Sequence, residues 1–485
     1  MYMETIAEWA EDFNTLEKMV FKAMCKAACE TMVEMLQRQD QIIKALRDKD
    51  EYILVDPSRE RTIKTLMGEV SYKRGYYKAK SGGRVHLLDE ALGITKDYGL
   101  YSEALAEQII VECGDKSFRR AADTISELTG QSVSVMAAWG VLQKYGDKVQ
   151  EQEKRLSELD AGGTTGQLGN IASKVLFQEM DDVWLSMQKK KRRKAGTPSA
   201  KGNKKSGKKP LHVGIAYTGW SERKDGRYAT TDKIATTSFG GAKEFNGHFE
   251  MLLRHRYDMD GVDLRLMNGD GANWIKSSAD ESDAILQLDP YHRSQAILRG
   301  VSDRESRRKI YDAIREKDID KTLAVTYSLV EGAEDDITRE KAAELHGYFS
   351  ENRESLLTWT ERGIKLPAPP EGVVYRNMGV QESSNCGLIT HRMKHRKGSW
   401  SEEGATNMGK ILCYRHTIGF DEMLGPMPEP KAPKAETEPL SVGKVPFYEG
   451  KGYGGDWLYA GMPFDQAFRT NGREAIRGIL KQKPL

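Results

Sequence analysis

Apolar residues recur at helical intervals in two long parts of the chain. Residues 8–48 contain neither Gly nor Pro and carry apolar side chains at mostly helical spacing (Phe13, Leu16, Val20, Met24, Ala28, Met35 and Ile42). This pattern predicts one long amphipathic helix, or two. The spacing is not a strict heptad, so packing within the domain is favoured over a dimerisation coil. Residues 300–365 also have a helical pattern and are highly charged, so we expect further helices there.

Other stretches have the period of two that is typical of strands. Residues 61–80 (RTIKTLMGEVSYKRGYYKAK) alternate on either side of Gly68, which predicts a β-hairpin. Further along, we expect the following order: strands at 175–187, 210–219 and 228–239, a helix near 243–255, a strand that ends before Asp270, a helix, and the short strand AILQLD (284–289). A helix that begins near Glu382 comes last. This order predicts an α/β fold.

Residues 115–146 contain two helical patterns separated by Gly130. The first runs from Phe118 to Leu128, and Ser134 is a suitable N-cap for a second helix from Val135 to Lys144. Two short helices joined by a glycine turn match a helix-turn-helix, whose second helix enters the DNA major groove. An ordinary αα-hairpin would have the same pattern, so this segment alone does not decide between them.

Composition narrows the classes of partner. The chain has 74 Lys and Arg against 72 Asp and Glu, so only local clusters of charge carry information. The strongest cluster, residues 189–209, holds eleven Lys or Arg and no acid, beginning with Lys189, Lys190, Lys191, Arg192 and Arg193. We expect this loop to meet DNA phosphates, although such loops are often only solvated. The five cysteines form no CxxC pair, and no stretch approaches the roughly 18 apolar residues of a membrane span. These features favour a soluble, cytoplasmic protein with no membrane partner.

Three carboxylate positions are candidates for metal chemistry. Asp181 and its neighbour Asp182 lie in an apolar strand, Asp270 lies between two glycines after another strand, and Glu382 opens a helix. Two aspartates from separate strands and a later glutamate can hold two Mg²⁺ ions roughly 3.5–4 Å apart for attack on a phosphodiester. Arg392, Lys394 and Arg396 follow Glu382 and either grip the DNA backbone or form a solvated face. Taken singly, Asp270 also fits a helix N-cap and Glu382 a first-turn acid.

Several motifs resemble a known family. EMD with the following MQ, GDGANWI followed by LDPYHR, and QESSN with RMKHRKGSWSEEGATNM are similar to bacterial insertion-sequence transposases of the ISLre type, within the DDE superfamily. The resemblance covers roughly residues 55 to 420 and implies an RNase H-like catalytic domain. It also implies Asp181, Asp270 and Glu382 as ligands of two Mg²⁺ ions, or of Mn²⁺, with Asp182 as the rival to Asp181. His292, in a D-x-x-H signature, would orient a phosphate or water, or is a structural histidine.

The resemblance implies the organisation and the function of the chain. We expect an N-terminal helical segment (1–55), a β-hairpin region (56–100), a helix-turn-helix module (101–160), an RNase H-like domain in two parts (172–299 and 371–424) around a helical insertion (300–370), and a linker with a C-terminal tail (425–485). The implied activity is metal-dependent cleavage at element ends and strand transfer into target DNA. The implied partners are terminal inverted repeats, target DNA and further copies of the chain, in a bacterial, nucleoid-associated setting. The alternatives are an RNase H-like nuclease or resolvase without strand transfer, and a catalytically inactive DNA-binding derivative.

Overall fold

The computed structural model describes residues 12–94, 97–161, 169–188, 207–395 and 398–417. The chain divides into two compact units, residues 1–35 with 426–485, and residues 36–425. In the first unit, the described residues belong to helix α2 (Phe13–Leu46), which is a single helix and continues into the second unit. All the features below belong to residues 36–425. The expected linker and tail from residue 425 onward lie outside the described residues.

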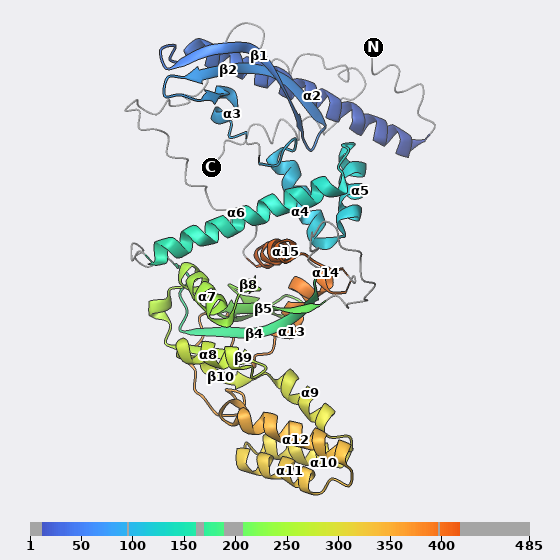
Figure 1. Ribbon diagram of the computed structural model, residues 1–485, viewed down its shortest axis with the longest axis vertical. Coiled ribbons are helices and arrows are strands. Elements are labelled where there is room, and N and C mark those ends of the chain that lie inside the picture. The colour runs from blue at the N-terminus through green and yellow to red at the C-terminus, as the bar shows by residue number, and fades with distance from the viewer. Residues whose placement is uncertain (1–11, 95–96, 162–168, 189–206, 396–397, 418–485) are drawn as a thin grey trace, which may run out of the picture. The chain divides into compact units, whose positions relative to one another are not determined.

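A small antiparallel sheet follows α2. Strands β1 (Tyr52–Lys64), β2 (Glu69–Ala79) and β3 (Arg84–Val85) pair in the order β1-β2-β3, and helix α3 (Leu87–Ala91) follows (Figure 1). Lys64 pairs with Glu69 on either side of the turn, so the hairpin expected around Gly68 is confirmed. The buried carboxylate of Asp89 accepts hydrogen bonds from Arg61 and Arg74, which joins α3 to the two long strands.

Three helices come next: α4 (Glu103–Asp115), α5 (Phe118–Thr129) and α6 (Val135–Ala161). Gly130 ends α5 in the left-handed conformation, with φ of 66°, and the Ser134 side chain accepts a hydrogen bond from the backbone N–H of Ala137. The expected turn and cap are therefore present. The expectation of a second helix ending at Lys144 was wrong. Helix α6 has 27 residues because its later turns pack against α15 (Glu402–Arg415), where Glu153 forms a 2.9 Å ion pair with Lys410.

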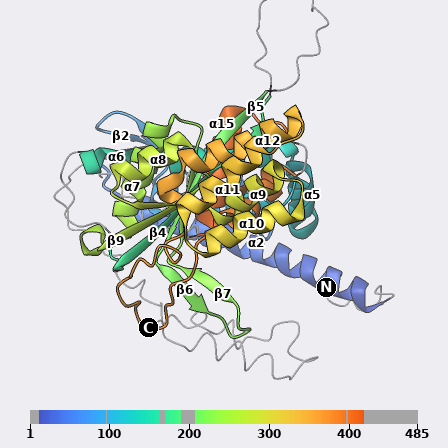
Figure 2. The same cartoon turned by 90° about the horizontal axis from the view of Figure 1, so that it is seen from below.

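A five-stranded sheet forms the centre of the second unit (Figure 1). Its strands are β4 (Val175–Ser186), β5 (Lys208–Tyr217), β8 (Ile234–Ser238), β9 (Leu264–Gly269) and β10 (Ile285–Leu288), in the order β10-β9-β4-β5-β8. Strands β4, β9 and β10 are parallel, whereas β5 is antiparallel to both β4 and β8. The strand expected over 228–239 is divided at Asp232, whose φ is 52°. Its first part, β7 (Tyr228–Thr231), pairs instead with β6 (Gly219–Glu222) in a hairpin labelled in Figure 2.

Each face of the sheet is covered by helices. One face packs against α7 (Ala242–Arg256) and α8 (Asn273–Glu281), with Met180 and Met267 in the shared core. The short 3₁₀ turn Met259–Gly261 leads from α7 toward β9. The opposite face packs against α15 and against a helical run from α13 (Gln381–Asn385) through a π-helical segment (Cys386–Thr390) to α14 (His391–Met393). The parity of side chains along each strand therefore decides which layer a residue reaches.

Helices inserted after β10 form a third core. They are α9 (Pro290–Gly300), α10 (Arg304–Arg315), α11 (Ile319–Glu331) and α12 (Asp336–Glu351), followed by the 3₁₀ turn Arg353–Ser355. They lie together in both Figure 1 and Figure 2, and Ile297, Ile310, Leu345 and Phe349 are among their buried residues. The helical character expected for residues 300–365 is confirmed. In the described part of the chain, no helix has the length and apolar character needed to cross a membrane.

Candidate active site

Asp181 and Asp270 lie side by side at the edge of the central sheet. Strands β4 and β9 are parallel, with Glu179 opposite Asn268, so two residues further along each strand bring Asp181 opposite Asp270. Asp181 is two residues after Glu179, and Asp270 is two residues after Asn268, so both aspartates face the same side of the sheet as those two residues. Asp289 follows the next parallel strand, and its backbone N–H donates to the Gly269 carbonyl over 2.8 Å. Asp181 therefore lies in β4 just past the point where its pairing with β9 stops, and Asp270 and Asp289 directly follow β9 and β10.

The ionisation of Asp181 is perturbed at this edge. Burial raises the pKa of the Asp181 carboxyl to about 6, and the negative charges of Asp270 and Asp182 act in the same direction, against His292 and the Asp182 backbone N–H. A partly buried carboxylate whose pKa is raised by desolvation and by a neighbouring negative charge is stabilised in the ionised form by a nearby cation. This is the electrostatic character expected of a metal-binding edge.

His292 lies between two of these carboxylates. Its Nε2 is 4.0 Å from Asp181 Oδ2 and 3.8 Å from Asp289 Oδ2. The position follows from the local fold, because Asp289 caps α9 by accepting a hydrogen bond from the Tyr291 N–H at 3.1 Å, and His292 is in the first turn of that helix. The structure therefore brings together Asp181, Asp270 and His292 of the expected site.

Asp182 points to the opposite layer. Its Oδ1 is 2.5 Å from His212 Nδ1, and the His212 ring lies 4.5 Å from that of Trp274 in the layer of α7 and α8. Adjacent strand residues face opposite sides of a sheet, so only Asp181 shares a face with Asp270. This geometry favours Asp181 over its neighbour as the residue of the site.

Glu382 is near the site without contacting the two aspartates. It is exposed in the first turn of α13, one turn before Asn385, whose Nδ2 donates to Asp181 Oδ2 over 2.8 Å. Gln381 holds the Asn385 amide by donating to its Oδ1 at 2.9 Å. Asn385 is thus the residue of this helix that reaches Asp181. Asn385 lies in QESSN, one turn after Glu382, and that position is the sequence signal for its role.

Buried Glu179 fixes α13 on the sheet. Its carboxylate is fully buried and accepts five hydrogen bonds, from Tyr217 Oη (2.6 Å), Asn268 Nδ2 (3.0 Å) and the backbone N–H groups of Gly379, Val380 and Gln381 (3.1 Å each). Burial raises the pKa of Glu179, and the hydrogen bonds from Tyr217 and the backbone oppose that shift. The residue two positions before Asp181 therefore holds the helix that carries Asn385 and Glu382.

The donor set suits a hard divalent cation. In the described part of the chain, no three His, Cys, Asp or Glu side chains gather as a metal cluster. Mg²⁺, however, is commonly bound by one or two carboxylates, with water and substrate phosphates as its other ligands. Asp181 and Asp270 meet that requirement, and their mutual repulsion favours a cation between them. The place of Glu382 in the ligand set stays a prediction.

The residues expected to contact DNA divide into three groups. Lys189, Lys190, Lys191, Arg192, Arg193 and Arg396 lie outside the described residues. Lys394 is exposed and stays a prediction. Arg392 requires a correction, because it is buried: its Nε donates to the Cys113 carbonyl over 2.6 Å, and its guanidinium lies 5.1 Å from the Phe118 ring and 5.2 Å from the Trp400 ring. Arg392 thus joins α14 to α4 and α5.

Fold and site together define a mixed α/β protein with two aspartates on neighbouring parallel strands, where the pairing of those strands stops. Residues 6–423 match the model of an uncharacterised protein family, UPF0236, and the chain belongs to that family. A UPF0236 protein of Caldanaerobacter subterraneus subsp. tengcongensis, whose name joins several numbered designations, is 23% identical over 407 residues, 81% of this chain and 76% of the relative. The UPF0236 protein in the vanSb 3′ region of Streptococcus gallolyticus is 24% identical over 433 residues, 86% of each chain.

Similarity to solved structures is low. A pre-cleavage Mos1 transpososome has a TM-score of 0.12 and 14% identity, and the match covers 52% of this chain and 78% of that one. The Mos1 strand transfer complex has the same TM-score, 12% identity, and covers 53% and 78%. So low a TM-score does not define a shared fold, and the functional argument rests on the site itself.

Proposed function

We propose that this protein is a metal-dependent DNA transposase of the DDE class with an RNase H-like catalytic domain. The observation that carries the proposal is the placing of Asp181 and Asp270 on one face where the pairing of parallel strands β4 and β9 stops, with His292 beside them. Two carboxylates in this arrangement suit phosphodiester chemistry with divalent cations.

The order of elements supports the RNase H-like part of the proposal. Three strands in antiparallel succession (β4, β5 and β8), a helix, and two further strands parallel to the first (β9 and β10) follow one another as the sequence pattern predicts for that fold. The helical insertion α10–α12 falls between β10 and α13, also as expected. The aspartates and Glu382 are thus far apart in sequence, although α13, which carries Glu382, packs on the same sheet.

A relative's name offers independent support. One UPF0236 relative carries several numbered designations within one organism. A single protein sequence found under several designations is what several copies of one gene would produce, and mobile DNA generates such copies. We propose that the gene of the present chain likewise belongs to mobile DNA.

The chain's own residues have defined tasks in the proposed reaction. Asp181 and Asp270 would bind the cations, and His292 would orient a phosphate oxygen or the attacking water. When bound, divalent cations activate the attacking oxygen and stabilise the leaving oxygen of an in-line displacement. Asn385 and Glu179 would position the Asp181 carboxylate and the α13 helix. Water attack would release a 3′-OH at the element end, and that hydroxyl would then attack target DNA.

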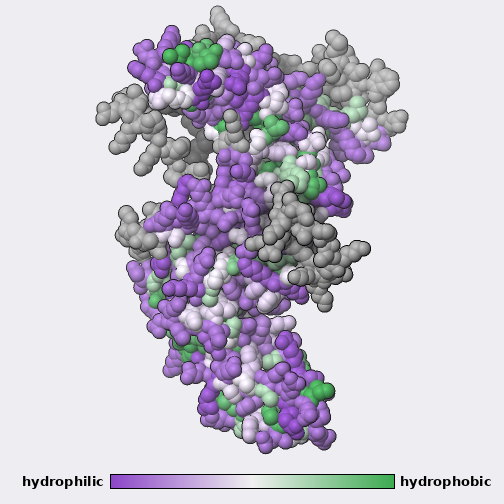
Figure 3. Space-filling view, viewed as in Figure 1, coloured by the Kyte–Doolittle hydropathy of each residue, from purple (hydrophilic) through white to green (hydrophobic). Residues whose placement is uncertain are grey.

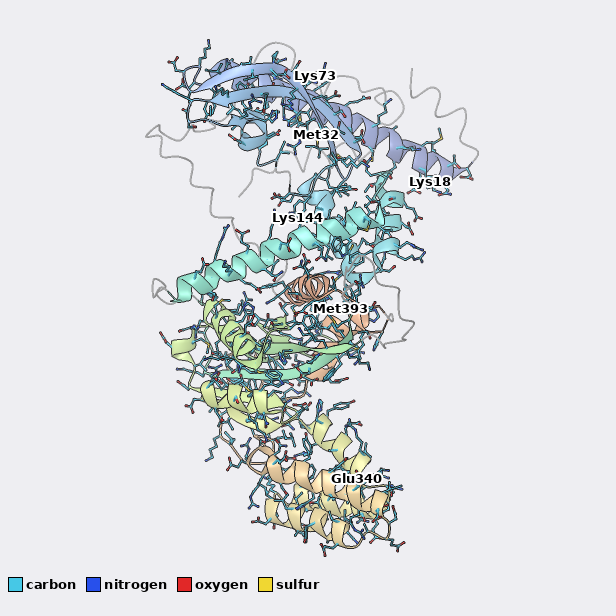
Figure 4. All side chains as sticks on the ribbon, viewed as in Figure 1. Lys18, Met32, Lys73, Lys144, Glu340 and Met393 are labelled. Carbon is cyan, nitrogen blue, oxygen red and sulfur yellow. The ribbon has the colours of Figure 1, made fainter. Side chains whose placement is uncertain are left out.

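The N-terminal part of the second unit would recognise DNA. The left-handed Gly130 after α5 and the Ser134 cap of α6 support the proposed helix-turn-helix. Exposed cations lie on both helices: Arg119 and Arg120 on α5, and Lys144, which is labelled in Figure 4, on α6. Exposed arginine and lysine side chains supply the phosphate contacts that dominate affinity for duplex DNA. Two element ends must be brought together, so we expect more than one copy of the chain in the active assembly.

Cleavage and strand transfer together test the proposal. A labelled duplex carrying DNA from beside the gene would be incubated with Mg²⁺ and the native protein, Asp270→Asn or Asp280→Asn. Asp280 is an exposed aspartate of α8 outside the site, so its variant controls for the loss of one charge. We expect cleavage by the native protein and by Asp280→Asn, and none by Asp270→Asn, which should still bind DNA.

Pre-cut ends offered with a target plasmid would separate the alternatives. Joined products are the result expected of a transposase. Cleavage without joining would favour a nuclease or resolvase. Binding of DNA by all three proteins without cleavage by any would favour a DNA-binding protein and contradict the proposal.

A further inference from the structure

A pocket adjoins the paired aspartates on the side of the helical insertion. It has a volume of about 270 Å³ and lies between α9 and α12, with Asp270 and His292 in its lining. Other lining residues include Arg299, Lys341, Glu344 and Tyr348. The volume is just below the roughly 300–1,000 Å³ of most small-molecule sites, so it suits a group about as large as one phosphate with its sugar.

The walls of the pocket are fixed to the aspartate edge. Tyr348 of α12 donates a 2.7 Å hydrogen bond to the Asp270 carbonyl. Gly300 lets α9 approach α12 closely, because a Cβ at this position would lie 2.7 Å from Leu345 Cβ. A group bound between the two helices would therefore be held at a constant place relative to Asp270.

Two exposed cations line the pocket, Arg299 and Lys341. Among the described residues, neither side chain forms a hydrogen bond or an ion pair, and the charge of Lys341 acts at longer range on Asp335. Other cations of the insertion are paired: Arg315 with Asp312, Lys321 with Glu316, and Arg339 with Asp336. Figure 3 shows a largely hydrophilic surface over α10–α12, and Figure 4 marks Glu340, the residue before Lys341, on α12. The lining carboxylates are Asp270, which belongs to the candidate metal edge, and Glu344.

We propose that this pocket binds the backbone phosphate of a DNA nucleotide next to the phosphate held at Asp181 and Asp270, through Arg299 and Lys341. The inference rests on the proposed function. It states where the DNA strand continues beyond the phosphate at Asp181 and Asp270. A guanidinium matches phosphate geometry with two parallel hydrogen bonds, and a lysine adds a point charge. The helical insertion therefore guides the strand past the aspartates.

The test is the salt dependence of binding to the duplex used for cleavage, in Ca²⁺, measured by fluorescence anisotropy. Each phosphate contact contributes about 0.9 to the slope of log affinity against log salt for duplex DNA. Arg299→Gln and Lys341→Gln should each lower the slope by about 0.9, whereas Arg299→Lys should retain it. Arg304→Gln removes the same charge from an exposed position of α10 outside the pocket and should leave the slope unchanged. Glu344→Gln removes the repelling charge and should tighten binding.

The outcomes separate this inference from the proposed function. Unchanged slopes in Arg299→Gln and Lys341→Gln would overturn the inference, even if Asp270→Asn abolishes cleavage. Lowered slopes in both, with Arg304→Gln like the native protein, would support it even if Mg²⁺ gave no cleavage. A native protein that binds no DNA would overturn both. Thermal unfolding of each variant shows whether a lowered slope comes from lost folding. If a variant is unfolded, Arg299→Lys must bind DNA like the native protein for the inference to stand.

Discussion

Glu179→Gln should loosen α13 without changing the aspartates. The native carboxylate accepts hydrogen bonds from Tyr217, Asn268 and three backbone N–H groups, of Gly379, Val380 and Gln381. Glutamine has the same shape but only one acceptor oxygen. If its amide nitrogen replaces Oε2, it faces the Asn268 amide and the Gln381 N–H. If it replaces Oε1, it faces the N–H groups of Gly379 and Val380 and the Tyr217 hydroxyl. Either way, at least two donors lose their acceptor.

The magnitude follows from those two contacts. A hydrogen bond to a charged group contributes about 1.5–3 kcal/mol, so losing two corresponds to about 3–6 kcal/mol. At about 1.4 kcal/mol per factor of ten, local opening of the α13 segment should become about 100- to 10,000-fold more frequent. The site is fully buried, so solvent does not replace the lost acceptors.

Amide hydrogen exchange of peptides covering residues 379–393 measures this opening. We expect much faster exchange in Glu179→Gln, and unchanged exchange in peptides from α10 and α11. Glu250→Gln is the matched control, since it removes a carboxylate that pairs with Arg265 on the opposite layer. Exchange in residues 379–393 that stays within about threefold of the native rate would refute the assignment of Glu179 as the anchor of α13, because that change is below 1 kcal/mol.

Three further variants have expected results. Burial alone would raise the pKa of Glu153, but Lys410, His248 and Tyr414 outweigh burial and lower that pKa to about 2. The ionised carboxylate therefore stabilises the fold fully above the unfolded pKa of about 4.5, and this stabilisation is lost as pH falls through 2. Urea unfolding at each pH should show that Glu153→Gln lacks it. At neutral pH the same variant, which leaves Lys410 buried and unpaired, should lose about 3–5 kcal/mol. Arg392→Gln should lower the melting temperature with little change in the salt slope of DNA binding, and a lowered slope in a folded variant would restore its assignment to DNA. Glu382→Gln should lose Mg²⁺-dependent cleavage and keep gel-shift binding, and full cleavage would remove it from the ligand set.

Much of the fold follows from local sequence pattern. The period-two stretches became β4, β5 and β9 within two residues of their expected ends, because buried strands are specified by alternating apolar side chains. Helix α6 was expected to be much shorter. Its last turns are stabilised by contacts with α15, which lies some 260 residues away in sequence. A short stretch of sequence does not reveal such a distant partner.

The candidate site was predictable where it depended on strand parity. Asp181 lies in an apolar strand and Asp270 follows another, and the family resemblance implied both as ligands; the choice against Asp182 needed only the pairing that the structure supplies. Asn385 was missed as part of the site, and the anchoring role of Glu179 was not predicted, because their contacts join segments about 200 residues apart. Arg392 was assigned to DNA from its charge alone, whereas its burial depends on Phe118 and Trp400 from distant elements.

The most direct test compares two neighbouring aspartates. Asp181 and Asp182 are adjacent in sequence and face opposite sides of the sheet, so Asp181→Asn and Asp182→Asn change the same charge at almost the same place in the chain. We would measure Mg²⁺-dependent cleavage of a duplex carrying DNA from beside the gene, with gel-shift binding in parallel. The account predicts that Asp181→Asn binds DNA without cleaving it and that Asp182→Asn still cleaves. Equal cleavage by both variants and the native protein would contradict it.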